Sequence, residues 1–164
     1  MPVVIIRDEA PADRAGIRAL VLAAFGGAQE ADLVDRLRTD GDAAISLVAV
    51  DGERVVGHVL LSRMSAPFRA LGLAPVSVLP DRQGTGIGTR LIRAGLERAE
   101  LGGWRGVFVL GEPAYYRRFG FDAALASGFA SPYAGPYLMA LALGGSLPAT
   151  AGSVDYPQAF RMLS

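Results

Sequence analysis

Residues 76–91 read V-S-V-L-P-D-R-Q-G-T-G-I-G-T-R-L. An apolar, β-branched run stops at Pro80, glycines follow at 84, 86 and 88, and a helical pattern of apolar residues begins near Gly86. Backbone N–H groups in a first helical turn have no intrahelical partner, and the helix macrodipole is positive there. Glycines let an anion approach that backbone without a Cβ clash. The stretch therefore predicts a strand, a phosphate-binding turn and a helix.

Three known nucleotide-binding motifs can be compared with this glycine turn. A Walker A loop requires a lysine, and all 16 basic residues of the chain are arginines. The dinucleotide pattern G-x-G-x-x-G fails because its third glycine would fall on Thr89. The pattern Q-x-x-G-x-G is met by Gln83, Gly86 and Gly88. On this loop alone, a plain strand-to-helix turn remains the alternative.

A second motif lies at residues 113–121, P-A-Y-Y-R-R-F-G-F, in which Tyr116 precedes Gly120 by four residues. With the glycine turn, it resembles the GCN5-related N-acetyltransferase (GNAT) family, and the order of elements agrees from about residue 3 to 143. Further similarity to the YhbS-like bacterial subgroup rests on three short patterns. These are E-x-x-L-V-x-x-L from Glu30, G-E-P-x-Y-Y from Gly111 and L-M-A-L from Leu138.

The periodicity of apolar residues predicts a mixed α/β fold. Asp13 is the expected N-cap of a first helix that stops at Gly26-Gly27. The resemblance implies a central, mostly antiparallel sheet of about six or seven strands, splayed at the cofactor site and flanked by about four helices. Strands are expected at 3–7, 45–50, 55–61, 73–79, 107–110 and 137–143. Helices are expected from Asp13 to the stop at Gly26-Gly27, from Glu30 to the end at Asp40-Gly41, and at 86–101 and 114–119.

Length and composition limit the possible classes. The 164 residues, 51% hydrophobic and 20% charged, predict one domain over 1–164, with a core at about 3–143 and an irregular tail at 144–164. The absence of cysteine excludes disulfides and thiolate chemistry, and the single histidine, His58, argues against a metal site. Zero net charge gives no case for nucleic acid. Without a membrane-length apolar run or signal peptide, a cytoplasmic protein is expected.

The resemblance implies acetyl-CoA as co-substrate. The backbone of Val76 and Val78, on either side of Ser77, would pair with the pantetheine arm, and the N–H of Val78 would polarise the thioester carbonyl. The N–H groups of Gly84, Thr85, Gly86, Ile87, Gly88 and Thr89 would hold the pyrophosphate, and the side chains of Gln83 and Thr89 are candidates for further contacts.

The same resemblance indicates which residues would protonate the leaving thiolate and deprotonate the attacking amine. Tyr116 matches the general acid that protonates the thiolate, with simple aromatic packing as the alternative. Members of the family often place a glutamate on the strand at 73–79, but no carboxylate occurs there. Glu112 and Glu30 are the candidate bases, and for Glu30 a helix-start carboxylate is the alternative. A water relay also remains open, whereas His58 is interpreted as a sheet histidine.

The functional hypothesis is an N-acetyltransferase that transfers an acetyl group directly to an amine of a small molecule or peptide. The rival is a non-catalytic module that binds or senses acyl-CoA with the same fold. The Gly/Pro- and aromatic-rich stretch at 127–137 is a candidate wall of the acceptor pocket or a dimer contact. The acceptor is unidentified, and a homodimer is typical of many family members.

Overall fold

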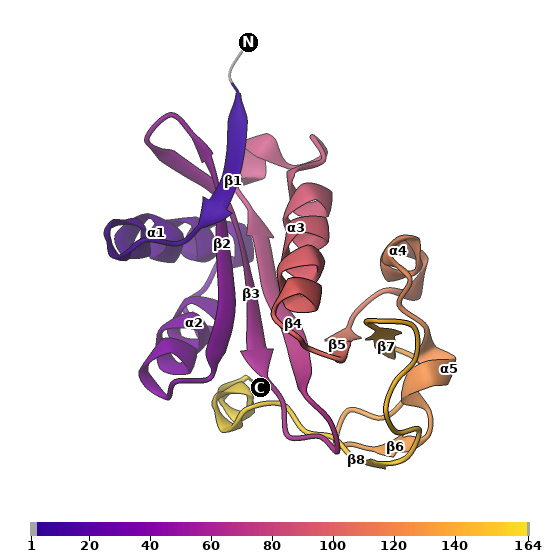
Figure 1. Ribbon diagram of the computed structural model, residues 1–164. Coiled ribbons are helices and arrows are strands. Elements are labelled where there is room, and N and C mark those ends of the chain that lie inside the picture. Colours follow the sequence, from indigo (N-terminus) through magenta and orange to yellow (C-terminus); the bar gives the residue numbers. More distant parts are fainter. Residues whose placement is uncertain (1–2, 164) are drawn as a thin grey trace.

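The computed structural model describes residues 3–163, so the predicted domain limits at residues 1 and 164 lie outside the described residues. The strands are β1 (Val4–Asp8), β2 (Ala43–Asp51), β3 (Arg54–Arg63), β4 (Ala70–Val78), β5 (Gly106–Leu110), β6 (Phe129–Ala130), β7 (Leu138–Ala142) and β8 (Gly152–Ser153). The helices are α1 (Arg14–Phe25), α2 (Gln29–Thr39), α3 (Ile87–Leu101), α4 (Pro113–Tyr116) and α5 (Ala123–Ala126). The predicted mixed α/β class is confirmed (Figure 1).

The central sheet has the order β1-β2-β3-β4-β5-β7, and β4 and β5 are its parallel neighbours. These two strands pair over a short distance, from Ala70 with Gly106 to Gly72 with Phe108. Beyond Gly72, β4 continues to Val78 with no further β5 partner. The sheet therefore separates into two parts at Gly72, which confirms the predicted mostly antiparallel, splayed sheet.

Helices cover both faces of the sheet. Helices α1 and α2 lie against one face and α3 lies against the other (Figure 1). Each interface has its own apolar core. On the α1/α2 face the core includes Ile17, Val21, Leu37, Val48 and Leu60. On the α3 face it includes Leu47, Val59, Leu61, Leu91 and Ile92.

The structure corrects three local expectations. Strand β4 begins at Ala70, three residues before the predicted start, because residues 70–72 form the pairing with β5. The sequence does not predict the short helix α5, because a pattern of apolar residues at helical spacing cannot be recognised over four residues. Asp13 stands at the N-cap position of α1 but makes no side-chain cap; its carboxylate instead accepts from Arg7 and from the N–H of Ala10.

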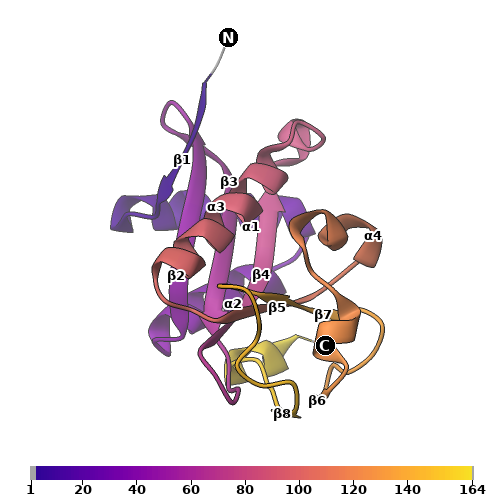
Figure 2. The same ribbon diagram turned by 45° about the vertical axis from the view of Figure 1, so that its right-hand side comes forward.

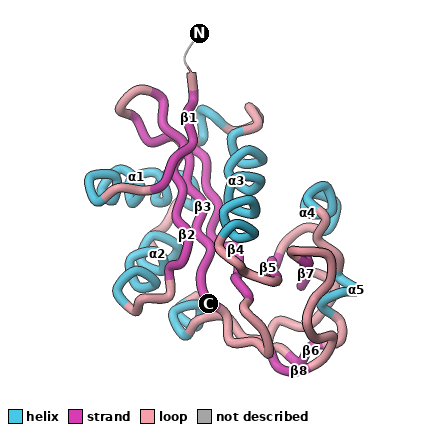
Figure 3. Tube along the Cα trace, in the orientation of Figure 1, coloured by secondary structure: helices cyan, strands magenta, loops and turns pink. Residues whose placement is uncertain are grey.

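The chain after β7 returns beneath the sheet. Figure 3 shows a loop that leads from β7 to β8, which pairs with β6. A 3₁₀ turn at Gln158–Met162 then packs near α2 (Figure 2). Tyr156 and Phe160 of this segment are 7% exposed each and belong to the core on the α1/α2 face. No helix within residues 3–163 has the length and apolarity needed to cross a membrane.

Candidate active site

The glycine turn has the backbone that phosphate binding requires. Gly84 and Gly86 have φ values of +77° and +87°, in the left-handed region that favours glycine, and a Cβ at either position would face open space. Gly86 stands immediately before the first residue of α3, which is 15 residues long. The first N–H groups of α3 therefore point out of the helix at the end of this turn, as the sequence predicted.

Strand β4 presents its backbone to the gap between β4 and β5. The N–H of Leu79 donates to the carbonyl of Val56 on β3. Because successive residues of a strand alternate in direction, the N–H and C=O of Val78 face away from β3, toward the gap. Gln83 donates from its side-chain amide to the carbonyl of Val78 at 3.1 Å, so it contacts the end of the strand.

A cleft of about 340 Å³ joins the two sequence motifs. It is lined by Val78, by the glycine turn from Arg82 to Thr89, and by Tyr115 and Arg118. The hydroxyls of Thr89 and Tyr115 lie 3.3 Å apart, and the Arg118 guanidinium stacks over the Tyr115 ring at 4.4 Å. The cleft thus combines free N–H groups with the cations of Arg118 and of Arg82, whose guanidinium is paired with Asp51 at 2.6 Å, and these donors suit a diphosphate. The sequence reading missed both arginines, although Arg82 directly precedes the Q-x-x-G-x-G motif.

Tyr116 lies on the other side of the gap, at the end of α4. Its ring is perpendicular to that of Tyr115 at a centroid distance of 5.1 Å and packs against Gly111, where an added Cβ would come within 2.4 Å of the ring. Burial raises the pKa of Tyr116, and the neighbouring Tyr115 raises it further. Its hydroxyl therefore carries its proton at neutral pH, and it makes no hydrogen bond within residues 3–163.

The two candidate carboxylates are not brought together. Glu112 is an exposed residue at the N-cap position of α4, four residues before Tyr116. Glu30 is half-buried in the first turn of α2, on the opposite side of the sheet from α4 (Figure 1). Neither forms an ion pair among the described residues. Arg69 stacks on Trp104 at 4.1 Å, near the end of α3.

Tyrosines from the last third of the chain lie at the base of the gap. The Tyr156 ring packs on Gly72, the last β4 residue paired with β5, where a Cβ would lie 2.6 Å from the ring. Tyr133, from the predicted acceptor wall, contacts Tyr156 edge-to-face at 5.4 Å. Burial raises the pKa of Tyr156, and the hydroxyls of Tyr133 and Tyr116 raise it further, so the three lie within electrostatic reach. No sequence motif marks Tyr156.

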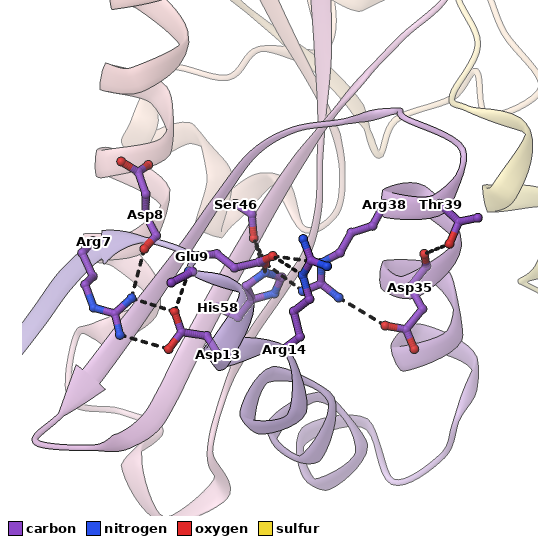
Figure 4. Close-up of polar contacts among 11 residues, drawn as sticks. Arg7, Asp8, Glu9, Asp13, Arg14, Asp35, Arg38, Thr39, Ser46 and His58 are labelled. Atoms are coloured by element: carbon purple, nitrogen blue, oxygen red, sulfur yellow. Dashed lines mark hydrogen bonds and ion pairs between the residues drawn. The ribbon is translucent and has the colours of Figure 1, made fainter.

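His58 is fully buried on β3 and belongs to a polar cluster with Ser46, Glu9 and Arg38 (Figure 4). Burial lowers the pKa of His58 to about 4; the Glu9 carboxylate partly offsets this and Arg38 reinforces it. The imidazole is therefore neutral at pH 7, as expected for a sheet histidine. Within residues 3–163, no group of three or more His, Asp or Glu side chains is arranged to hold a metal ion.

Relatives of this chain share its sequence over most of its length. A profile described as Acetyltransferase (GNAT) domain matches residues 42–123. The uncharacterized N-acetyltransferase YjhQ of Escherichia coli K12 is 42% identical over 130 residues, which span 74% of this chain and 71% of YjhQ. The uncharacterized N-acetyltransferase YhbS of the same strain is 40% identical over 124 residues, or 73% of this chain and 74% of YhbS.

Solved structures agree with this similarity. The crystal structure of E. coli YhbS in complex with CoA superposes with a TM-score of 0.93 at 32% identity, over 100% of this chain and 95% of YhbS. A GNAT family acetyltransferase from Brucella melitensis, in complex with acetyl-CoA, superposes with a TM-score of 0.82 at 38% identity, over 98% and 99% of the two chains. Both the sequence and the splayed sheet show that the chain belongs to the GNAT acetyltransferase family.

Proposed function

We propose that this protein is a single-domain N-acetyltransferase that transfers the acetyl group of acetyl-CoA directly to an amine. The observation that carries the proposal is the cleft in which the glycine turn, the end of β4 and the tyrosine motif meet. Two relatives of the same fold are crystallised with CoA and acetyl-CoA, which supports this choice of co-substrate.

The residues present fit acetyl-CoA. The first N–H groups of α3, together with Arg82 and Arg118, would hold the pyrophosphate, since the positive φ of Gly84 and Gly86 leaves the backbone open toward an anion. The gap-facing N–H and C=O of Val78 and the backbone of Val76 would pair with the amide groups of the pantetheine arm. Gln83 orders this edge because it holds the carbonyl of Val78.

When bound, acetyl-CoA supplies an activated acyl group with a thiolate leaving group. The N–H of Val78 faces the gap, where it can donate a hydrogen bond to the carbonyl oxygen as negative charge develops on it. Tyr116 holds a proton at neutral pH on the opposite side of the gap, so it can donate that proton to the departing sulfur. The chain has no cysteine, which favours direct transfer over an acetyl-cysteine intermediate.

The acceptor side is assigned to the face of the sheet that carries α1 and α2. Tyr156 and Tyr133 bring aromatic surface and hydroxyl groups to the base of the gap, and Glu30 lies in the first turn of α2, which borders this face. Glu112 and Glu30 remain the proposed carboxylates for binding or deprotonating the amine. A homodimer and a cytoplasmic location remain predictions of the sequence.

A non-catalytic acyl-CoA sensor is the second candidate, because β4 carries no carboxylate that could serve as the base. A panel of primary amines, assayed for release of free CoA thiol, separates the two functions. We expect thiol release that depends on one class of amine, and the chain adds no thiol background because it lacks cysteine. Binding of acetyl-CoA without amine-dependent thiol release would support the sensor instead.

A further inference from the structure

Two arginines lie on aromatic rings beside the cofactor cleft. The Arg118 guanidinium lies over the Tyr115 ring at 4.4 Å. The Arg93 guanidinium lies over the Phe119 ring at 5.1 Å, and the two rings contact each other with centroids 5.5 Å apart. Arg93 belongs to α3, whereas the other three side chains belong to α4 and to the 3₁₀ turn that follows it (Figure 1). The four side chains therefore form a continuous row that joins α3 to the α4 segment.

Both guanidinium groups keep donors that can bind an anion. Within residues 3–163, neither forms an ion pair with a carboxylate. Arg118 donates from Nε to a backbone carbonyl at 2.9 Å, which leaves its two terminal nitrogens. Arg93 does not pair even with Glu97, which follows it by four residues on α3, a spacing at which helical ion pairs commonly form. Arg82 differs from both, because Asp51 at 2.6 Å already offsets its charge.

Arg93 lies one helical turn beyond the residues that would hold the diphosphate. Thr89 and Arg93 are four residues apart on α3, so they share one face of the helix. Thr89 Oγ1 lies 3.3 Å from the Tyr115 hydroxyl, and Arg93 lies over Phe119, so this face is turned toward α4. Thr89, Tyr115 and Arg118 line the cofactor cleft. Arg93 and Phe119 line a second cleft, of about 730 Å³, on the same side of α3.

A CoA thioester carries a second phosphate group beside its diphosphate. The ribose that bears the diphosphate at its 5′ carbon bears a phosphate monoester at its 3′ carbon. Such a monoester has a charge of about −1.5 to −2 at pH 7 and three strong acceptor oxygens. Guanidinium groups bind phosphate through paired, charge-assisted hydrogen bonds, and their planar fork fits its oxygens. The chemistry of the two arginines therefore matches the part of CoA that the glycine turn leaves without a partner.

The charges along α3 determine where this monoester fits. With the diphosphate on the first N–H groups of α3, the covalent structure of CoA holds the monoester one ribose ring away. Further along the helix, Glu97 and Glu100 line the second cleft together with Arg93. Their negative charges repel a phosphate, whereas Arg93 and Arg118 attract it. The favourable place for the monoester is therefore the end of the groove that Arg93 and Arg118 form.

We propose that Arg93 and Arg118 bind the 3′-phosphate of CoA, so that the protein recognises the nucleotide end of its acyl donor. This inference rests on the proposed function, because that function places the diphosphate at the glycine turn. Arg118 also lines the diphosphate cleft and is shared between the two phosphate groups, whereas Arg93 serves the 3′-phosphate alone. The rings beneath both arginines hold them in place and so reduce the side-chain entropy lost on binding. The preferred donor is an acyl-CoA, and not the same acyl group on 3′-dephospho-CoA or on a carrier protein's phosphopantetheine arm.

Binding calorimetry with CoA and with 3′-dephospho-CoA measures this preference without a known acceptor. We expect the parent protein to bind CoA about ten-fold more tightly, because hydrogen bonds between charged groups are lost with the 3′-phosphate. Arg93→Gln should lower the affinity for CoA toward that for 3′-dephospho-CoA. The same variant should leave the affinity for 3′-dephospho-CoA nearly unchanged, because this ligand lacks the group that Arg93 binds. Arg118→Gln should weaken the binding of both ligands and also reduce the ratio of their affinities.

The matched control is Arg90→Gln, which removes the same charge from the same helix. The Arg90 guanidinium donates to the carbonyl of Val4 at 2.9 Å, on β1, at the edge of the sheet opposite β7. The ratio of the two affinities should therefore stay at the parent value in this variant. Equal affinities of the parent for the two ligands, or equal ratios in Arg93→Gln and Arg90→Gln, would overturn the inference. Binding of neither ligand by the parent would instead refute the proposed function, which keeps the two failures distinct.

Discussion

Tyr116 is the residue on which the proposed chemistry depends most. It lies between Tyr115 and Phe121, with ring centroids 5.1 and 5.9 Å away, so its position is fixed by packing and its hydroxyl is left for the gap. Tyr115 differs in role, because its hydroxyl lies 3.3 Å from Thr89 in the cofactor cleft.

Tyr116→Phe should lower kcat about 100-fold while the affinity for acetyl-CoA stays nearly unchanged, because the variant loses the proton donor and keeps the ring. The neighbouring Tyr115→Phe is the matched control and should affect acetyl-CoA affinity more than kcat. Steady-state kinetics with the best amine, together with calorimetric titration of acetyl-CoA, measure both. Full turnover by Tyr116→Phe would remove this residue from the mechanism.

The burial of His58 makes stability depend on pH. Its pKa falls from 6.5 in the unfolded chain to about 4 in the folded protein, so the unfolded chain binds more protons between these values. The free energy of unfolding should therefore decrease by about 2 kcal/mol from pH 7 to pH 5. Urea unfolding at both pH values tests this, with His58→Gln as the control that should lose most of the dependence. A parent protein with equal stability at pH 7 and pH 5 would contradict the burial described here.

At the scale of elements, a glycine packs under a tyrosine ring at two places: on β4, and directly after the end of β5. Gly72 on β4 supports Tyr156, and Gly111, which follows β5, supports Tyr116. The two strands pair only from Ala70 to Gly72 of β4 and then diverge. The shape of the gap between them therefore depends both on this short pairing and on the two glycine–tyrosine contacts.

Gly111→Ala should displace Tyr116, because the new Cβ would lie 2.4 Å from its ring. We expect a loss of kcat of the same order as for Tyr116→Phe, about 100-fold, with acetyl-CoA affinity retained. A double-mutant cycle provides the control: in the Tyr116→Phe background, Gly111→Ala should cost little more. Independent, additive losses would show that Gly111 acts through something other than Tyr116.

The elements near the motifs were predictable from sequence, whereas those set by long-range packing were not. The glycine turn and α3 follow from local backbone preferences, so residues 76–91 alone indicate them. Gly84 and Gly86 then take the left-handed backbone that this turn requires. The extra residues of β4 at its start, 70–72, form a strand because β5 lies beside them, and each β5 partner is 36 residues away in sequence. Tyr156 reaches the site only through the return of the C-terminal segment.

At the scale of the whole molecule, the C-terminal segment, residues 154–163, completes the core on the α1/α2 face of the sheet. The 3₁₀ turn at Gln158–Met162 lies against α2, and Phe160 is 7% exposed and packs on Tyr156 at 4.9 Å. Because Tyr156 in turn packs on Gly72, the segment links α2 to the base of the gap. The composition of residues 144–153, rich in glycine and small residues, gives no sign of this path, whereas the apolar residues within 159–163 indicate that the end of the chain is tied down.

Phe160→Ala should lower the free energy of unfolding by about 3 kcal/mol, because it removes a buried aromatic ring from the core on the α1/α2 face. Met162→Ala is the control, since Met162 is 44% exposed and its truncation should cost about 0.5 kcal/mol or less. Equilibrium unfolding in urea compares the two. Equal stability of both variants would show that the C-terminal segment does not support the sheet.

The central claim is that acetyl-CoA binds at the glycine turn, and thermal unfolding with increasing acetyl-CoA tests it most directly. Three proteins are compared: the parent, Gly86→Glu in the turn, and Gly41→Glu, a glycine with a similar φ of +77° and open surroundings between α2 and β2. Ligand at about 100 times its Kd stabilises a one-site protein by about 2.7 kcal/mol, a shift of a few degrees. The account predicts this shift in the parent and in Gly41→Glu and its loss in Gly86→Glu. No shift in the parent, or an equal shift in Gly86→Glu, would contradict it.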